Sequence, residues 1–249
     1  MNPRLYRYLQ VLVALGLAFF LLDRFATGKL LWYINARFVV LTVLGIVGLI
    51  AMSANALEHL RITRRLEIDE GHEEHSYVPD AVRWNLFLLT LPLIFGLLIP
   101  AQPLGVDAAA SRGVVVSAPL ASGDVSPGSL AAAPDERNIL DWIRIFNYES
   151  DLALFLGEPA NVIGFIYRDP RLTDGQFMVS RFAVSCCVAD AFAIGLIVDW
   201  PETASLPEDG WVDVTGTIDT GELNGQRVPL LRADSVTLVD PPAQPYLFP

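Results

Sequence analysis

The chain has 249 residues, of which 53% are hydrophobic, and its mean hydropathy of +0.42 is high for a soluble domain and indicates membrane-spanning segments. Its formal net charge is −11, and the charge is uneven, because the first hundred residues carry nine Lys and Arg against eight Asp and Glu, whereas the remainder carries eight against twenty. The acidic second half excludes a nucleic-acid partner, which needs a basic surface. The high apolar content excludes a fully disordered chain.

Three uncharged apolar runs lie at the start of the chain, at residues 8–22, 38–57 and 84–106. A helix needs about 20 apolar residues to cross the hydrocarbon core of a bilayer. The second and third runs reach that length, and the first does so if the flanking Arg7 and Arg24 extend back to the lipid headgroups. We therefore predict that residues 1–106 form three transmembrane helices in the lipid bilayer, the third of them kinked at Pro92. Buried helices of a soluble protein are the alternative.

Basic residues in the short loops predict the orientation in the membrane. The side that holds the N-terminus and the loop at 58–83 has six of them, and the other side has four; they are Arg4, Arg7, Arg61, Arg64, Arg65 and Arg83 against Arg24, Lys29, Arg37 and Arg112. This bias predicts a cytoplasmic N-terminus and, after three crossings, an extracytoplasmic C-terminal domain.

The second half of the chain reads as a linker followed by a small β domain. Residues 107–137 are rich in Ala, Ser, Gly and Pro, which predicts a flexible linker. Residues 138–156 repeat apolar side chains at helical spacing and predict a helix. Five strand-like runs follow, at 161–167, 176–185, 193–199, 211–219 and 227–239, and Asn224-Gly225 predicts a hairpin turn between the last two.

This order of elements predicts the fold class. A helix followed by five short strands in residues 138–249 is typical of a small OB-like β-barrel, and a β-sandwich is the alternative. The whole chain is thus predicted to be a membrane α + β protein, with three transmembrane helices, a flexible linker and a C-terminal OB-like domain.

Cys186 and Cys187 are the only cysteines and are adjacent. Neighbouring Cα atoms lie about 3.8 Å apart, below the usual range for a disulfide, so that a bridge between them would be strained. Asp190 follows three residues later, within reach if the chain turns. The pattern is open to two interpretations, buried structural cysteines or a metal or redox site, and these three residues are our candidates for ligand binding.

The loop at 58–83 carries a second candidate site, with two imidazoles and several carboxylates close together. Glu70, His72, Glu74 and His75 are the candidate ligands of a divalent metal such as zinc, and a solvated acidic loop is the alternative. The two histidines are spaced i and i+3, whereas the metalloprotease motif needs i and i+4, so we disfavour a protease.

The stretch from Arg181 to Ala191 contains Cys186-Cys187 and then Ala189-Asp190-Ala191, and Gly195-Leu196-Ile197-Val198 follows it. This pattern resembles the YcgQ-like family of bacterial membrane proteins. Further matches along the chain are Gly164-Phe165, Trp211-Val212 with Val214 and Gly216, Pro241-Pro242 and Pro245-Tyr246. The resemblance implies a multi-pass protein of the bacterial plasma membrane that is the smaller subunit of a two-component permease, beside a larger polytopic permease-like protein.

We therefore expect an integral membrane accessory subunit and not an enzyme, with an extracytoplasmic domain that binds a ligand, a metal or the permease. Two alternatives stay open. One is a membrane-anchored thiol or metal-dependent enzyme that uses Cys186 and Cys187, and the other is a purely structural interaction module. The three histidines are His59, His72 and His75, all in the first half, so a Cys–His dyad within the C-terminal domain is excluded.

Overall fold

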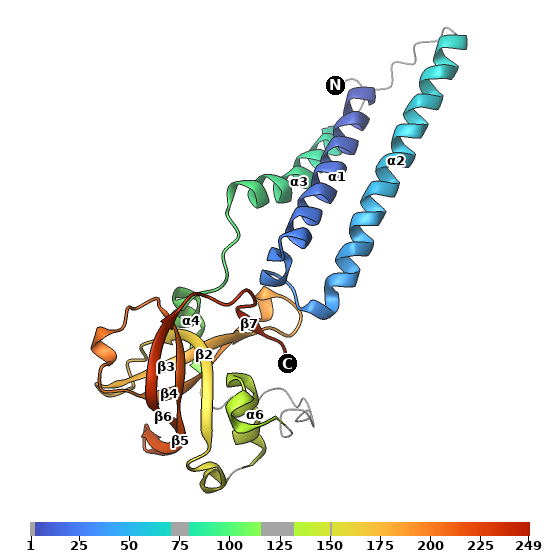
Figure 1. Cartoon of the computed structure of the whole chain (residues 1–249). Helices are drawn as coiled ribbons and strands as arrows, with labels where there is room; N and C mark the ends of the chain where they lie inside the picture. Colours follow the sequence, from blue (N-terminus) through green and yellow to red (C-terminus); the bar gives the residue numbers. More distant parts are fainter. Residues whose placement is uncertain (1–2, 71–79, 116–131, 150) are drawn as a thin grey trace. The chain divides into compact units, whose positions relative to one another are not determined.

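The computed structural model describes residues 3–70, 80–115, 132–149 and 151–249. The chain divides into two compact units, Met1–Gln102 and Pro103–Pro249 (Figure 1). Each unit has its own interior, and each is described by itself below.

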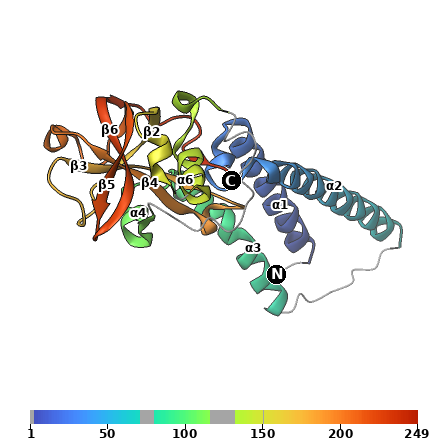
Figure 2. The same cartoon turned by 90° about the horizontal axis from the view of Figure 1, so that it is seen from below.

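The N-terminal unit consists of three helices, of which α1 packs against both others: α1 (Pro3–Ala26), α2 (Val39–Glu70) and α3 (Asp80–Leu98). Two 3-10 turns connect α1 to α2: η1 (Lys29–Trp32) and η2 (Ala36–Phe38). Figures 1 and 2 show α1 and α2 running side by side. Because the connection is short, the two helices are antiparallel, and the start of α1 lies beside the later turns of α2.

Two of these helices are long and apolar enough to cross a membrane, over Leu5–Ala26 and Ala36–Ile62. The apolar part of the third helix, Trp84–Leu98, is shorter than the predicted run at 84–106. At 1.5 Å per residue it is about 22 Å long. The predicted run at 84–106 includes Pro100 and Pro103, and a helix commonly ends before a proline. Pro92 lies inside α3, as predicted.

Apolar side chains cover much of the surface of the helices. Only 17% of the apolar window of α1 and 11% of that of α2 is buried. Leu12 is 68% exposed and Phe19 is 73% exposed. A continuous apolar surface of this kind is unfavourable in water and is typical of contact with lipid or with another protein.

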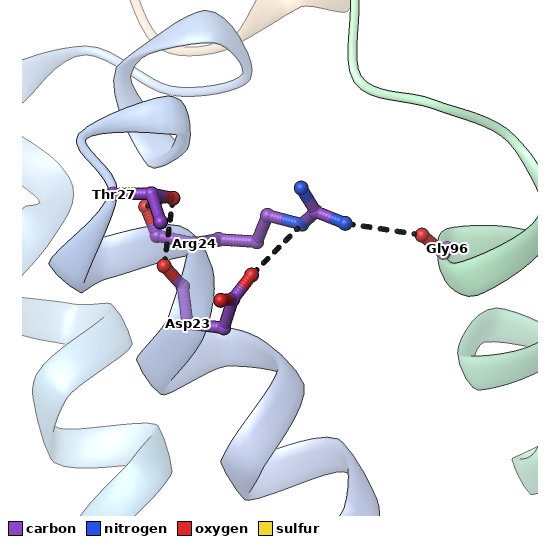
Figure 3. A network of polar contacts seen from close by, with 4 residues as sticks. All are labelled: Asp23, Arg24, Thr27 and Gly96. Atoms are coloured by element: carbon purple, nitrogen blue, oxygen red, sulfur yellow. Dashed lines mark hydrogen bonds and ion pairs between the residues drawn. The ribbon is translucent and has the colours of Figure 1, made fainter.

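The helices α1 and α3 approach closely at two glycines. A Cβ added to Gly96 would lie 2.6 Å from Cζ of Phe20, and one added to Gly16 would lie 3.0 Å from Leu93. Figure 3 shows Arg24 beside this contact, where its guanidinium donates to the carbonyl of Gly96 at 3.4 Å and lies 3.9 Å from the carboxylate of Asp23. Small residues thus allow the close packing that is common between membrane helices.

The C-terminal unit is built around five long strands: β2 (Pro159–Tyr167), β3 (Gln176–Ala183), β4 (Phe192–Asp199), β5 (Trp211–Leu223) and β6 (Gln226–Val239). The pairs β2–β3, β3–β4, β5–β6 and β2–β5 are antiparallel, and β4–β6 is parallel. Following these pairings from β2 returns to β2, so each of the five strands has a neighbour on both sides. Two short strands, β1 (Val114–Val115) and β7 (Tyr246–Leu247), join β4 and β3 respectively in parallel.

All five predicted strands are present, and the predicted hairpin is confirmed. Asn224 and Gly225 have φ of 53° and 77°, the left-handed values that a tight two-residue hairpin turn requires. The strands β5 and β6 continue up to this turn and are longer than predicted.

The core of this unit lies between the strands and α6 (Ile139–Tyr148), which Figure 2 shows beside them. Asn138 and Asp141 form a capping box at the start of α6, and the helix buries Trp142 and Ile143 completely. The predicted helix at 138–156 was too long: α6 ends at Tyr148, and Leu152–Phe155 forms a separate 3-10 helix, η4.

The first part of the predicted linker at 107–137 is ordered. Residues Val106–Arg112 form α4, whose Ala109 is completely buried, and β1 follows directly. Near its end, Pro134–Glu136 forms a 3-10 turn, η3. The small side chains of this segment let α4 pack closely against β2 and β4. In this part of the chain they therefore do not form a flexible linker.

Candidate functional site

The adjacent cysteines lie in the connection between β3 and β4. The connection contains a single 3-10 turn, η5 (Val188–Asp190), which follows directly after Cys187. Cys186 is exposed and Cys187 is half-buried, so the interpretation of the pair as buried structural cysteines is wrong, and the other interpretations stay open. The two sulfurs are 3.7 Å apart, which is a contact between free thiols and not a disulfide.

Asp190 stabilises the conformation of the loop between β3 and β4 by hydrogen bonds to its backbone. Its carboxylate accepts the backbone N–H of Cys186 at 2.7 Å and that of Cys187 at 3.3 Å, one on each oxygen. The three residues that we predicted as one site are therefore brought together. Both carboxylate oxygens accept backbone hydrogen bonds, so Asp190 has a structural role in the loop.

The electrostatics of the loop keep Cys186 protonated. The hydrogen bond to the Asp190 side chain, followed by the contact with Cys187, raises the pKa of the Cys186 thiol to about 11. Burial raises the pKa of Asp190, but the hydrogen bonds from the Cys186 thiol and from backbone N–H groups outweigh it, so the net pKa is lowered. Because the thiolate is the form that attacks substrates and binds metals, Cys186 is not activated for either role at neutral pH.

Two neighbouring segments of the same unit fix the loop. Arg112, in the last turn of α4, donates to the carbonyls of Val188 at 3.3 Å and Ala191 at 2.7 Å, one in η5 and one just after it. On the other side, the N–H of Val184 donates to the carbonyl of Leu247 at 2.9 Å. The loop is thus held by α4 and by the C-terminal tail.

Hydrogen bonds of Arg181 and Tyr246 hold the C-terminal tail, the residues after β6, in place. Arg181 in β3 donates to the carbonyls of Pro245, at 3.1 Å, and Gln244, and burial lowers its pKa to about 10. The hydroxyl of Tyr246 accepts the N–H of Leu104 at 2.7 Å. Pro245-Tyr246 stood out in the sequence by resemblance. The roles of Arg112 and Arg181 could not be predicted, because their partners are backbone carbonyls that leave no pattern in the sequence.

The predicted metal ligands are not tested by the structure. His72, Glu74 and His75 lie outside the described residues, and the side chain of Glu70, at the end of α2, lies outside them too. Among the residues that the structure describes, no group of three or more His, Cys, Asp and Glu side chains is arranged to hold a metal ion. The zinc site in this loop stays a prediction.

A helical unit with exposed apolar faces, followed by a separate β domain, is typical of membrane-anchored proteins. Two family models match the chain in turn, the DUF1980 N-terminal domain at residues 9–115 and the DUF1980 C-terminal domain at residues 135–249. The chain belongs to the DUF1980 family.

Two named relatives match over nearly their whole length. The chain is 21% identical over 281 residues to the UPF0703 protein YcgQ of Bacillus subtilis (strain 168), covering 96% of this chain and 98% of the relative. It is 23% identical over 262 residues to a Streptococcus mutans protein named "Putative two-component membrane permease complex subunit", covering 89% and 92%. No solved structure matches the chain.

Proposed function

We propose that this chain is an integral membrane accessory subunit of a two-component permease. The observation that carries the proposal is the exposed apolar surface of α1 and α2, which are long enough to cross a membrane and little buried within their own unit. The full-length similarity to a protein named as a membrane permease complex subunit supports it. The partner is then a larger polytopic permease-like membrane protein.

An accessory role fits these helices better than transport by the chain alone. No Asp, Glu, Lys or Arg lies between Arg7 and Asp23 in α1, or between Arg37 and Glu58 in α2. Charged groups in the middle of membrane helices usually mark a substrate path. The substrate path is therefore assigned to the partner.

The membrane region of the proposal has three spans, with α3 as the third, within residues 1–106. Its 15-residue apolar part is short for a bilayer of about 30 Å, and local thinning or flanking residues that reach the headgroups would accommodate it. The excess of arginines on the N-terminal side supports a cytoplasmic N-terminus and an extracytoplasmic C-terminal domain in the bacterial plasma membrane.

The C-terminal domain, residues 138–249 with α4 and β1 added, is proposed to be an OB-like barrel. The closed circuit of pairings in the order β2-β3-β4-β6-β5, with β4 and β6 parallel, supports this reading. In such folds the loops between strands carry the binding functions. The loop with Cys186, Cys187 and Asp190 is then the proposed contact for a ligand or for the permease.

Co-purification tests the proposal. The full chain, with an affinity tag, is extracted in a mild detergent from its native membrane, and the larger permease-like protein is expected to co-purify with it. Washing membranes with alkaline carbonate should leave the chain in the pellet. A chain that leaves the membrane in carbonate, or that elutes as a lone monomer, would contradict the proposal.

The cysteine loop has its own test. Metal content is measured on the purified wild type and on the variant with both Cys186→Ser and Cys187→Ser. With Cys186 protonated at neutral pH, we expect equal metal content in both. If the loop contacts the permease, the variant should give a lower yield of the co-purified partner, and an unchanged yield would contradict that contact. Loss of metal in the variant would instead support the thiol or metal-dependent alternative.

A further inference from the structure

A groove of about 500 Å³ lies between α1 and α2 near the end where α1 begins. Three residues of α1 and four of α2 line it: Arg7, Gln10 and Val11, with Met52, Asn55, Ala56 and His59. Arg7, Asn55 and His59 are exposed, so the groove opens to the surroundings of the helix pair.

The side chains that line the groove change from polar to apolar along the helix axes. Arg7 is two residues inside the apolar window that starts at Leu5, and His59 is three residues inside the window that ends at Ile62. Both residues lie just outside the uncharged runs at 8–22 and 38–57, where the hydrocarbon core meets the headgroups. Val11 and Met52 lie deeper by about one to two turns and form the apolar end of the groove.

The polar end suits an anion. A guanidinium, an imidazole and a carboxamide provide hydrogen-bond donors, and none of the seven lining residues is acidic. The Gln10 amide donates to the hydroxyl of Tyr6 at 3.0 Å, which fixes the orientation of that side chain. An arginine with further donors at a membrane boundary is the chemistry that recognises a phosphate.

We propose that this groove binds an anionic phospholipid, with the headgroup phosphate at Arg7 and His59 and an acyl chain along Val11 and Met52. The inference rests on the proposed membrane insertion of the two helices. A water-soluble phosphate would use only the polar end, whereas a lipid matches both ends of the graded lining. Arg64 and Arg65 follow on the same end of α2 and would add to the attraction for anionic lipid.

Native mass spectrometry of the full chain in detergent tests this. The probes are dioleoyl phosphatidylglycerol and, as the neutral comparison, dioleoyl phosphatidylcholine. The wild type is expected to retain the phosphatidylglycerol in preference, and Arg7→Gln combined with His59→Gln should reduce its retention at least fivefold. Arg61→Gln is the matched control, because it removes a charge from an exposed residue at the same end that does not line the groove, and it should change retention less than twofold.

A second variant tests the groove independently, in case the first variant loses lipid because it folds poorly. Asn55→Leu keeps Arg7 and His59 and places a larger, apolar side chain in the groove, and it should also lower the retention of phosphatidylglycerol while the helical circular dichroism stays unchanged. Unchanged retention in both variants, an equal loss in Arg61→Gln, or equal binding of the two lipids would overturn the inference. Full displacement by glycerol 3-phosphate would overturn it too, in favour of a soluble anion.

Two further outcomes separate the inference from the proposed function. If the full chain stays in carbonate-washed membranes but shows no lipid preference, only the lipid site is lost. If the groove variants keep the lipid and lose the co-purified permease, the groove belongs to a partner helix and the lipid site is overturned.

Discussion

At the scale of single residues, the Cys186–Asp190 pair shows how one carboxylate can set the reactivity of a thiol. The carboxylate accepts backbone N–H groups and the thiol hydrogen together, so the proton stays on sulfur well above neutral pH. An exposed cysteine is thereby made less reactive without being buried.

This arrangement predicts the effect of Asp190→Asn on alkylation. Without the negative charge, the pKa of Cys186 should fall, the thiolate fraction at pH 8 should rise, and iodoacetamide should modify Cys186 about three- to tenfold faster. Mass spectrometry of the Cys187→Ser form, with and without Asp190→Asn, measures Cys186 alone. Asp174→Asn, at an exposed turn residue, is the control and should leave the rate unchanged. A slower reaction in the Asp190 variant would refute the assignment.

Asp169 predicts a pH dependence of stability. Its hydrogen bonds with Arg171, at 2.6 Å and 2.8 Å, lower its pKa below 3.8 against the opposing effect of burial. A lowered carboxyl pKa stabilises the folded state above the unfolded pKa, and this contribution disappears as the pH falls through the folded pKa. Asp169→Asn should therefore lower Tm by about 1–3 °C at pH 7, a modest effect because Arg171 is partly exposed.

The measurement is a pair of thermal melts across pH. The Tm difference between wild type and Asp169→Asn should hold from pH 7 to pH 5 and shrink below pH 4. A difference that grows on acidification would show that the sign of the pKa shift is wrong.

At the scale of elements, the β5–β6 pair depends on one glycine. The register shifts between Thr215 and Gly216, and a Cβ at Gly216 would lie 2.1 Å from the carbonyl oxygen of Arg232. Such a contact has to be relieved by moving the backbone of the partner strand. Gly216→Ala should therefore cost about 3 kcal/mol of unfolding free energy, measured by denaturant unfolding of the C-terminal unit. Gly105→Ala, with open space around its Cβ, should be near neutral.

The α1–α3 contact makes a matching prediction for the helices. Gly96→Leu should displace the ring of Phe20 and separate the two helices, because the Cβ alone would already lie 2.6 Å from that ring. Loss of thermal stability in detergent reports the effect. Gly45→Leu on α2, where nothing lies within 4 Å of the added Cβ, is the matched control and should be tolerated. Equal losses in both variants would show that the close approach at Gly96 does not matter.

The elements also show how far the sequence predicts the fold. The five strands and the Asn224-Gly225 hairpin follow from local alternation and turn chemistry, which act within a few residues. The helix at 138–156 was predicted too long because η4 keeps the apolar spacing of α6 across the break. The order of α4 and β1 was missed because the burial of Ala109 depends on contacts with β2 and β4, which are far away in the sequence.

The candidate site could be predicted only where its residues are close together in the sequence. Cys186, Cys187 and Asp190 are close in sequence, and they do form one loop. Arg112 is 76 residues from Val188, and the groove joins Arg7 to His59 across two helices. Such residues meet only after folding, so no spacing in the chain marks them.

At the scale of the whole molecule, the division into two units predicts that the C-terminal unit folds alone. A fragment of residues 103–249 contains the closed strand circuit, its core and the contacts of Leu104 and Arg112. It should be a soluble domain with a single cooperative thermal transition by circular dichroism. A fragment that starts at residue 116 lacks α4 and β1 and should melt at least 5 °C lower. Equal melting temperatures would show that α4 and β1 add nothing.

The closed strand circuit also limits how a partner can bind. Each of the five long strands has a paired neighbour on both sides, although the β2–β3 and β4–β6 ladders are short, and β1 and β7 occupy further positions beside β4 and β3. An incoming chain therefore finds no long, fully unpaired edge strand among those five along which it could extend the sheet. If the partner is the proposed permease, its affinity then comes mainly from side chains in the connections, so exchange of a few surface residues would be enough to redirect the domain from one permease to another without remaking its interior.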